Sequence, residues 1–320
     1  MSQYDFHRVE IPYRDFPASM FVPARADALA EEIARPSTSY WHDVWQRFRK
    51  DPLAMIGLAV FMIMVLTCIF YPLMTDRTFD GMNPSEGKQP PSWSHLCGTD
   101  QMGRDLFVRI MYGARISLAI GVGAAIINLV IGVIYGGLSG YIGGRVDMVM
   151  MRIVDIMTSL PSLLYTLLII TVFRELKVDE LVAIMVALCF TSWIGTARVV
   201  RNEVLRLKNS EYVMAAKLSG AKTRHLLLRH MVPNAMGPII VSTAFMVPGA
   251  IFSESFLSYL GLGIQKPMSS WGSLAKEGYD FYSRYPWLMI FPLVAISITM
   301  LALNFIGDGL RDALDPRLKH

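Results

Sequence analysis

The sequence is poor in charged residues and in cysteine. Asp, Glu, Lys and Arg make up 18% of its 320 residues, against about 25% in an average soluble protein, while 53% are apolar. The three cysteines, Cys68, Cys97 and Cys189, have no spacing typical of a disulfide framework or a metal site. This composition excludes a disordered chain, a collagen-like fibre and a disulfide scaffold. It also carries too much apolar surface for the two soluble domains that the length alone indicates.

Motifs for catalysis and for nucleotide binding are missing as well. The stretch from Gly81 to Lys88 has a passing likeness to a phosphate-binding loop, but five residues separate its glycines and Gln89 follows its lysine. A Walker A loop needs four residues between the glycines, and then Ser or Thr after the lysine. The apolar runs hold almost none of the ionisable residues that ion-driven carriers use. We expect no catalytic residue, metal or cofactor in this chain. We expect the energy for its function to be supplied by a partner protein at the cytoplasmic face.

Long apolar runs are what the sequence has in abundance. Six of them lack Asp, Glu, Lys and Arg and, alone or with flanking residues, are long enough to cross a bilayer core of about 30 Å as a helix. They do not alternate as the strands of a membrane barrel do. We therefore expect an all-α membrane protein with six transmembrane helices. The runs are residues 53–74, 116–144, 156–173, 181–197, 231–253 and 285–307.

The basic residues predict the orientation. With the N-terminus inside, the cytoplasmic segments hold 20 Lys and Arg and the outer segments hold 10. The largest share lies in residues 198–230, where eight basic residues face only Glu203 and Glu211. No early apolar core typical of a cleavable signal peptide is present. We expect a multi-pass protein of the cell (inner or plasma) membrane, embedded in the lipid bilayer, with both termini cytoplasmic.

These spans divide the chain into five parts. Residues 40–50 are aromatic and basic, which is typical of an interfacial helix or of an ordinary juxtamembrane anchor. The parts are a cytoplasmic N-terminal extension with this helix (1–52), the first transmembrane helix (53–74), an extracytoplasmic segment (75–115), a core transmembrane domain (116–307) that includes the cytoplasmic loop 198–234, and a cytoplasmic tail (308–320).

Four glycines stand at a spacing of four in the second span. On a helix they form a smooth stripe that another backbone can approach closely. We favour packing inside the bundle over a pore-lining role for this stripe. The residues are Gly132, Gly136, Gly140 and Gly144.

The basic loop carries a motif of small residues. A short helix around Ala215 and Ala216 has little side-chain bulk and can seat in a groove on another protein. Gly220 permits a sharp turn, and Pro233 suits the first turn of the next span. The candidate coupling residues are Glu211, Tyr212, Ala215, Ala216, Gly220, Ala221, His230, Pro233 and Asn234.

This motif resembles the "EAA" loop of ABC-importer permeases. Met214 stands where the short motif has its glutamate, and Glu211, three residues earlier, fits the variant of the peptide-transporter permeases. In that family the loop transmits movement from a nucleotide-binding subunit to the spans. The alternative is a basic loop that only sets the topology.

Two further stretches resemble the same permeases. In the first, residues 98–118, Thr99 or Asp100 is expected to cap a helix with Asp105 in its first turn, and Arg104 to pair with Asp100. Roles of Asp100, Arg104 and Asp105 in structure are favoured over contact with substrate. In the second, residues 254–272, Glu254 is the acid near membrane depth, and a pathway-lining role and a structural ion pair both stay open.

Residues 140–161 also fit the resemblance. Arg152 and Asp155 are three apart, so a local ion pair is expected on a helix. Pro161 should bend the third span or begin its regular part.

The resemblance implies one permease subunit of an ATP-driven importer that takes up di- or oligopeptides by alternating access, with the type I ABC importer fold. It implies a second, homologous permease subunit in a heterodimer, two cytoplasmic ATPase subunits that bind ATP and Mg, and an extracytoplasmic peptide-binding protein, with no nucleic acid. A permease of this kind for nickel or oligosaccharides stays open. So does a membrane protein outside the ABC group, such as an ion-driven carrier or a membrane enzyme.

Overall fold

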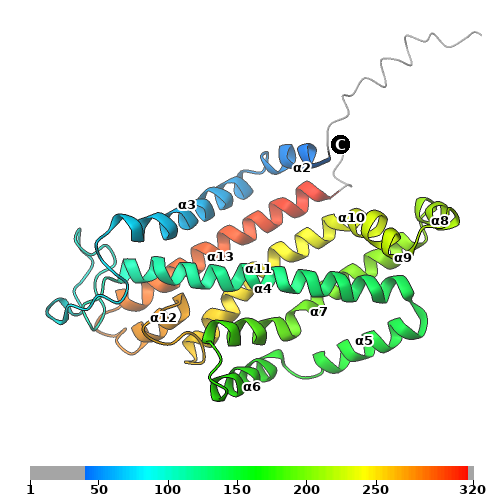
Figure 1. The fold of residues 1–320 in the computed structure, drawn as a ribbon. Coiled ribbons are helices and arrows are strands. Elements are labelled where there is room, and N and C mark those ends of the chain that lie inside the picture. The colour runs from blue at the N-terminus through cyan, green and yellow to red at the C-terminus, as the bar shows by residue number, and fades with distance from the viewer. Residues whose placement is uncertain (1–39, 316–320) are drawn as a thin grey trace, which may run out of the picture. The chain divides into compact units, whose positions relative to one another are not determined.

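The regular secondary structure in the described part of the chain, residues 40–315 of a computed structural model, consists of helices joined by loops (Figure 1). The expected extension over residues 1–39 and the last five residues of the tail lie outside the described part. The unit Val44–His320 holds all the elements discussed below. The helices are α2 (Tyr40–Phe48), α3 (Pro52–Met74), η2 (Pro84–Glu86), α4 (Leu106–Ile142), α5 (Gly144–Thr158), α6 (Ser162–Glu175), α7 (Glu180–Lys208), α8 (Glu211–Leu218), α9 (Thr223–His225), η3 (Leu226–Met231), α10 (Val232–Asn234), α11 (Met236–Tyr259), α12 (Trp271–Tyr279) and α13 (Trp287–Leu314).

Five helices are long and apolar enough to cross a membrane by themselves: α3, α4, α7, α11 and α13. The third expected span, residues 156–173, is not one helix. It is divided between α5 and α6, which are bent by 79° at a short break and count as a sixth span when taken together. Pro161 stands directly before α6, because a proline lacks the N–H that a continuing helix would need. The count of six therefore holds, with the third span broken.

The glycine stripe lies against α7. A Cβ atom built on Gly136 would stand 2.2 Å from the carbonyl oxygen of Ala197, and one on Gly132 would stand 2.6 Å from the Thr196 Cβ. The backbones of α4 and α7 are thus closer than any side chain permits, which confirms packing inside the bundle. The stripe has three members, because Gly144 lies beyond the end of α4 with a φ of +56° and open space around it.

The remaining helices are held by apolar contacts around buried aromatic and aliphatic side chains. Trp271, at the start of α12, is fully buried and its indole Nε1 donates to the Ile110 carbonyl at 3.1 Å. At the other end of the unit, Phe48 packs with Ala54 and Leu314. Figure 1 places α8 to α10 at one end of the long helices and α12, with the loop before α4, at the opposite end. The candidate coupling residues of the cytoplasmic loop therefore lie far from Asp100, Arg104 and Asp105.

Two local expectations need correction. Neither Thr99 nor Asp100 caps α4, since Asp105 is itself the N-cap and accepts a hydrogen bond from the Val108 N–H at 3.1 Å. Arg152 does not pair with Asp155, whose Oδ1 lies 3.3 Å from Arg198 Nη2 of α7. The cap is the residue directly before α4, whereas the partner of Asp155 comes from a different helix.

The α4–α7 contact predicts a sharp difference between neighbouring glycines. Gly136→Ala would press a methyl group onto the Ala197 carbonyl and should lower the free energy of unfolding by about 1–3 kcal/mol. Gly137→Ala is the matched control, because a Cβ there meets nothing within 4 Å. Thermal unfolding of the detergent-solubilised protein measures both. Equal melting temperatures for the two variants would contradict the close contact.

Candidate functional site

The loop between α7 and α11 carries the first candidate site. Helix α8 is anchored by Val213, which is 2% exposed and packs with Val204, Leu226 and Met231. The opposite face is open, with Ala215 exposed and Met214 and Leu218 50% and 89% exposed. When one face of a helix is packed against the protein and the other is apolar and exposed, the exposed face is typical of a surface that another protein covers.

Gly220 ends α8 in a turn. Its φ is +84°, a left-handed conformation in which side chains other than glycine are strained. The following N–H of Ala221 donates to the Ala216 carbonyl at 3.1 Å, and the Gly220 N–H donates to Lys217 at 3.0 Å. These bonds satisfy carbonyls that the helix end leaves free. The sharp turn expected at Gly220 is confirmed.

The chain returns toward α11 through α9, the π-helix η3 and α10. Pro233 lies in the first turn of α10 rather than of the span itself, which begins at Met236. The amide of Asn234 donates to the His230 carbonyl at 2.5 Å, and the rings of His225 and His230 are 5.4 Å apart. The last motif residues thus hold the return segment together.

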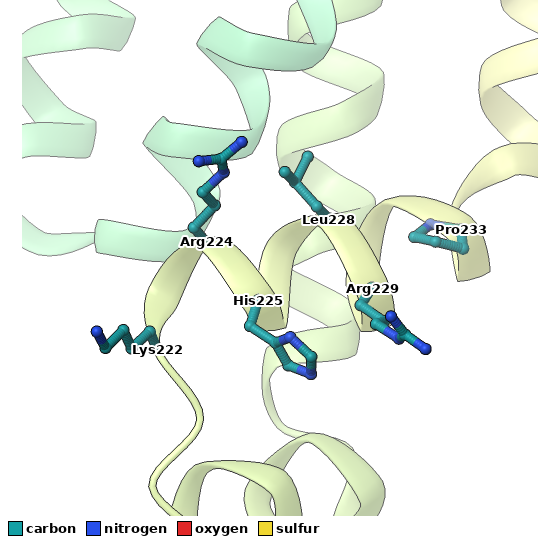
Figure 2. Close-up of a pocket in the computed structure, with 6 residues that line it drawn as sticks. All are labelled: Lys222, Arg224, His225, Leu228, Arg229 and Pro233. Atoms are coloured by element: carbon teal, nitrogen blue, oxygen red, sulfur yellow. The ribbon is translucent and has the colours of Figure 1, made fainter.

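A basic pocket opens on this return segment (Figure 2). It has a volume of about 580 Å³ and is lined by six residues from Lys222 to Pro233. Four of them are cationic or titratable: Lys222, Arg224, His225 and Arg229. Among the described residues, no carboxylate lies within ion-pair distance of these four side chains. Their charge is therefore available to an acidic group from outside residues 40–315.

An ion-pair network occupies the opposite end of the unit. Asp100 accepts from Arg104 Nε at 2.6 Å, as expected, and from Arg109 Nη1 at 2.7 Å. Arg109 also donates to both carboxylate oxygens of Glu277 in α12, at 2.8 and 3.1 Å. Asp100, Arg104 and Arg109 are each no more than 4% exposed. The network ties the loop before α4, α4 itself and α12 into one body.

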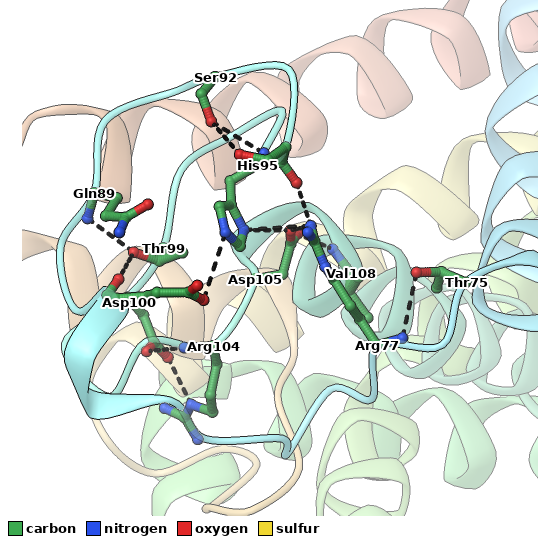
Figure 3. Close-up of polar contacts among 12 residues, drawn as sticks. Thr75, Arg77, Gln89, Ser92, His95, Thr99, Asp100, Arg104, Asp105 and Val108 are labelled. Carbon is green, nitrogen blue, oxygen red and sulfur yellow. Dashed lines mark hydrogen bonds and ion pairs between the residues drawn. The ribbon is translucent and has the colours of Figure 1, made fainter.

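A second cluster surrounds Asp105 (Figure 3). Its Oδ2 accepts from Arg77 Nη1 at 2.7 Å and lies 2.9 Å from His95 Nδ1, while its Oδ1 caps α4. Cys97 is buried nearby, and burial together with the charge of Asp105 raises the pKa of its thiol to about 12. One carboxylate thus serves three partners and fixes the loop to the start of α4.

Glu254 lies fully buried in α11 without an ion pair among the described residues. Hydroxyl groups hold it instead: Ser117 Oγ of α4 donates at 2.8 Å and Ser258 Oγ at 2.7 Å. The structural ion pair that the sequence left open is therefore absent from residues 40–315. Glu254 is 0% exposed in this subunit, and its pathway-lining role stays a prediction.

Sequence reasoning missed the central residues of these networks. Arg109 and Glu277 are far apart in the chain, and neither belongs to a motif. Arg201, which binds Asp147 through two nitrogen atoms at 2.5 Å, was counted only as a topology signal. One signal could have indicated that Arg109 has a buried partner. Arg109 lies four residues after Asp105, at the start of an apolar helix, where an unpaired charge is costly.

Comparison with known proteins assigns the family. Residues 128–320 match the model described as "Binding-protein-dependent transport system inner membrane component". Residues 39–91 match the "N-terminal TM domain of oligopeptide transport permease C". The oligopeptide transport system permease protein OppC of Bacillus subtilis is 48% identical over 96% of this chain and 99% of its own length. The OppC of Escherichia coli is 41% identical over 90% of this chain and 95% of its own length.

Solved structures agree on the fold. An inward-facing MetNI methionine ABC transporter matches with a TM-score of 0.54 and 19% identity, over 66% of this chain and 96% of that one. The helices, with one site at each end of the long helices, thus define a membrane component with the type I ABC importer permease fold. The chain belongs to the family of binding-protein-dependent transport system inner membrane components, and it is a transport subunit.

The buried network predicts a large effect of a single charge. Arg109→Ala removes a fully buried cation that bridges Asp100 and Glu277, leaves Arg104 as their remaining shared partner, and should cost about 3–5 kcal/mol of stability. Arg198→Ala is the control, because its ion pair with Asp155 is exposed and should be worth at most about 1 kcal/mol. Thermal unfolding in detergent compares them. A melting temperature of Arg109→Ala no lower than that of Arg198→Ala would show that the network does not hold this end together.

Proposed function

We propose that this subunit, with a second permease and two ATPase subunits, imports di- or oligopeptides that an extracytoplasmic binding protein delivers. Relatives at 48% and 47% identity over nearly the whole chain are named oligopeptide and dipeptide transport system permease proteins, which supports the substrate class. The partner set follows from the family. The ATP and Mg that drive transport are assigned to the ATPase subunits.

The observation that carries the coupling role is the exposed hairpin of α8 and Gly220. Its buried face rests on the end of α7 and on η3 through Val213, so a push on the exposed face reaches one span, α7, directly and reaches α11 through the return segment. Met214 and Leu218 offer an apolar surface and the neighbouring pocket offers unpaired positive charge. We assign the ATPase contact to this surface, with Glu211, Tyr212, Ala215, Ala216, Gly220 and Ala221 on the hairpin and His230, Pro233 and Asn234 on the return segment.

Orientation and division of the chain follow from this assignment. With the ATPases on the cytoplasmic side, α8 and both termini are cytoplasmic, as the distribution of Lys and Arg favours. Residues 75–105 and α12 then face the binding protein. The networks around Asp100 and Asp105 give this outer surface a rigid shape, a role that does not require contact with the peptide.

A reconstituted complex tests the proposed function. The subunit, co-expressed with the other subunits encoded beside it and purified in mild detergent, should bring two ATPase subunits along. In proteoliposomes with the binding protein, a labelled peptide should be taken up only with ATP, and it should stimulate hydrolysis. Uptake by the isolated chain under an ion gradient, indifferent to nucleotide, would contradict the proposal.

Substitution of Gly220 tests the coupling site. Gly220→Val forces a β-branched residue into a conformation at φ +84° that costs on the order of 1–3 kcal/mol, so the hairpin should deform and lose the ATPase subunits. Gly261→Val is the matched control, because Gly261 has a φ of +82°, equally open surroundings and a place at the other end of the unit. Both variants should insert into the membrane. Normal ATPase co-purification and normal uptake with Gly220→Val would refute the coupling role.

A further inference from the structure

A small pocket lies among the spans, where α6, α7 and α11 meet. Its volume is about 120 Å³, which is the size of one amino-acid side chain. Ten residues line it, and none of them is ionisable. Half of them carry a hydroxyl group: Ser162, Thr166, Thr191, Ser192 and Ser253. Three helices thus bring polar groups to one place in segments that are otherwise strongly apolar.

The hydroxyl groups present oxygen acceptors to the pocket. Ser192 Oγ donates its proton to the Leu188 carbonyl at 2.6 Å, and Ser253 Oγ donates to the Gly249 carbonyl at 2.9 Å. Thr166 is bound in the same way to the Ser162 carbonyl. A hydroxyl that has given its proton to its own helix still has lone pairs free. The pocket can therefore accept hydrogen bonds from N–H groups of a ligand.

Apolar rings complete the lining. Phe252 and Phe256 lie one turn apart on α11, with their rings stacked at 6.4 Å, and they are 54% and 41% exposed in this chain. Leu188 and Leu257 form the buried floor. An apolar pocket with a few placed polar groups is the usual form of a site for a small organic group.

The broken span supplies an independent argument. The break between α5 and α6 ends at Pro161, and Ser162 and Leu163 in the first turn of α6 line the pocket. Irregular backbone at membrane depth is tolerated where it is buried in protein or lines a water-filled cavity, and not against lipid. A face that combines hydroxyl groups with a helix break is thus unsuited to contact with lipid chains.

We infer that this pocket is a contact point for the transported solute on its way between the two permease subunits. The inference rests on the proposed function and adds the chemistry of recognition. The hydroxyl oxygens accept from backbone N–H groups, which every peptide has, and the phenyl rings cover an uncharged side chain. Because the lining carries no charge, the pocket does not select for acidic or basic residues. It fits peptides of varied sequence.

Kinetics of the reconstituted complex test this inference with tri-alanine as the probe. Thr191→Val and Ser253→Ala each remove one acceptor and should raise the KM for tri-alanine about five-fold, the factor for one ordinary hydrogen bond, with basal ATP hydrolysis unchanged. Thr171→Val is the matched control, since that exposed α6 hydroxyl donates to the Leu167 carbonyl outside the pocket. Its KM should stay at the wild-type value.

Labelling distinguishes a solute path from a protein–protein or lipid contact. A charged, water-soluble thiosulfonate should modify Ser253→Cys in the assembled complex, and tri-alanine should slow the modification. Thr171→Cys should stay unmodified, and the wild type, with its three buried cysteines, sets the background. The inference is wrong if the wild type imports tri-alanine but Ser253→Cys is not labelled. It is also wrong if tri-alanine does not slow the labelling of Ser253→Cys and the substitutions do not change the KM for tri-alanine. Absence of wild-type uptake of tri-alanine would instead overturn the proposed function on which the inference rests.

Discussion

The close contact of α4 with α7 is the constraint on which the rest of the structure depends. Gly132, Gly136 and Gly140 remove the α4 side chains from this interface, so that the α4 backbone lies directly against Thr196, Ala197, Arg201 and Val204 of α7 over several turns. In a bilayer, where apolar side chains gain little from leaving lipid, such van der Waals contact is a main source of helix association. α7 then carries α8 at one end, and α4 carries the ion-pair network at the other. A movement at either end therefore reaches a shared rigid pair.

The two ends of that pair are built from opposite chemistry. At the loop before α4, every buried charge has a partner: Arg109 joins Asp100 to Glu277, and Asp105 binds Arg77 and His95. A buried network of paired charges of this kind rigidifies the surface around it. At α8, the charges of the return segment and the apolar side chains of the hairpin have no partner in the described residues. The first end pairs its own charges, and the second leaves charged and apolar groups exposed.

How much was predictable from the sequence depended on whether the signal was local. The long apolar runs, the turn at Gly220 and the Asp100–Arg104 pair follow from spacing along one helix or loop, and the structure confirms all three. The break of the third span was foreseen as one of two outcomes, because Pro161 is a local signal. Arg109 with Glu277 and Arg201 with Asp147 could not be paired, since only the tertiary fold brings them together. The cap of α4 was misplaced because Thr99, Asp100 and Asp105 all have suitable side chains, and backbone geometry selects among them.

The division of one span into α5 and α6 has a mechanical consequence. The two halves have different attachments to α7: α5 is tied by the ion pairs of Asp147 and Asp155 in addition to apolar packing of Val154, whereas α6 is held by apolar packing around Ile170 and Leu188. A proline joint between them lets one half tilt while the other stays in place. This span consists of two helices joined at a proline, and the joint adjoins the hydroxyl-lined pocket. Rocking of α5 can therefore reshape that pocket without unfolding any helix.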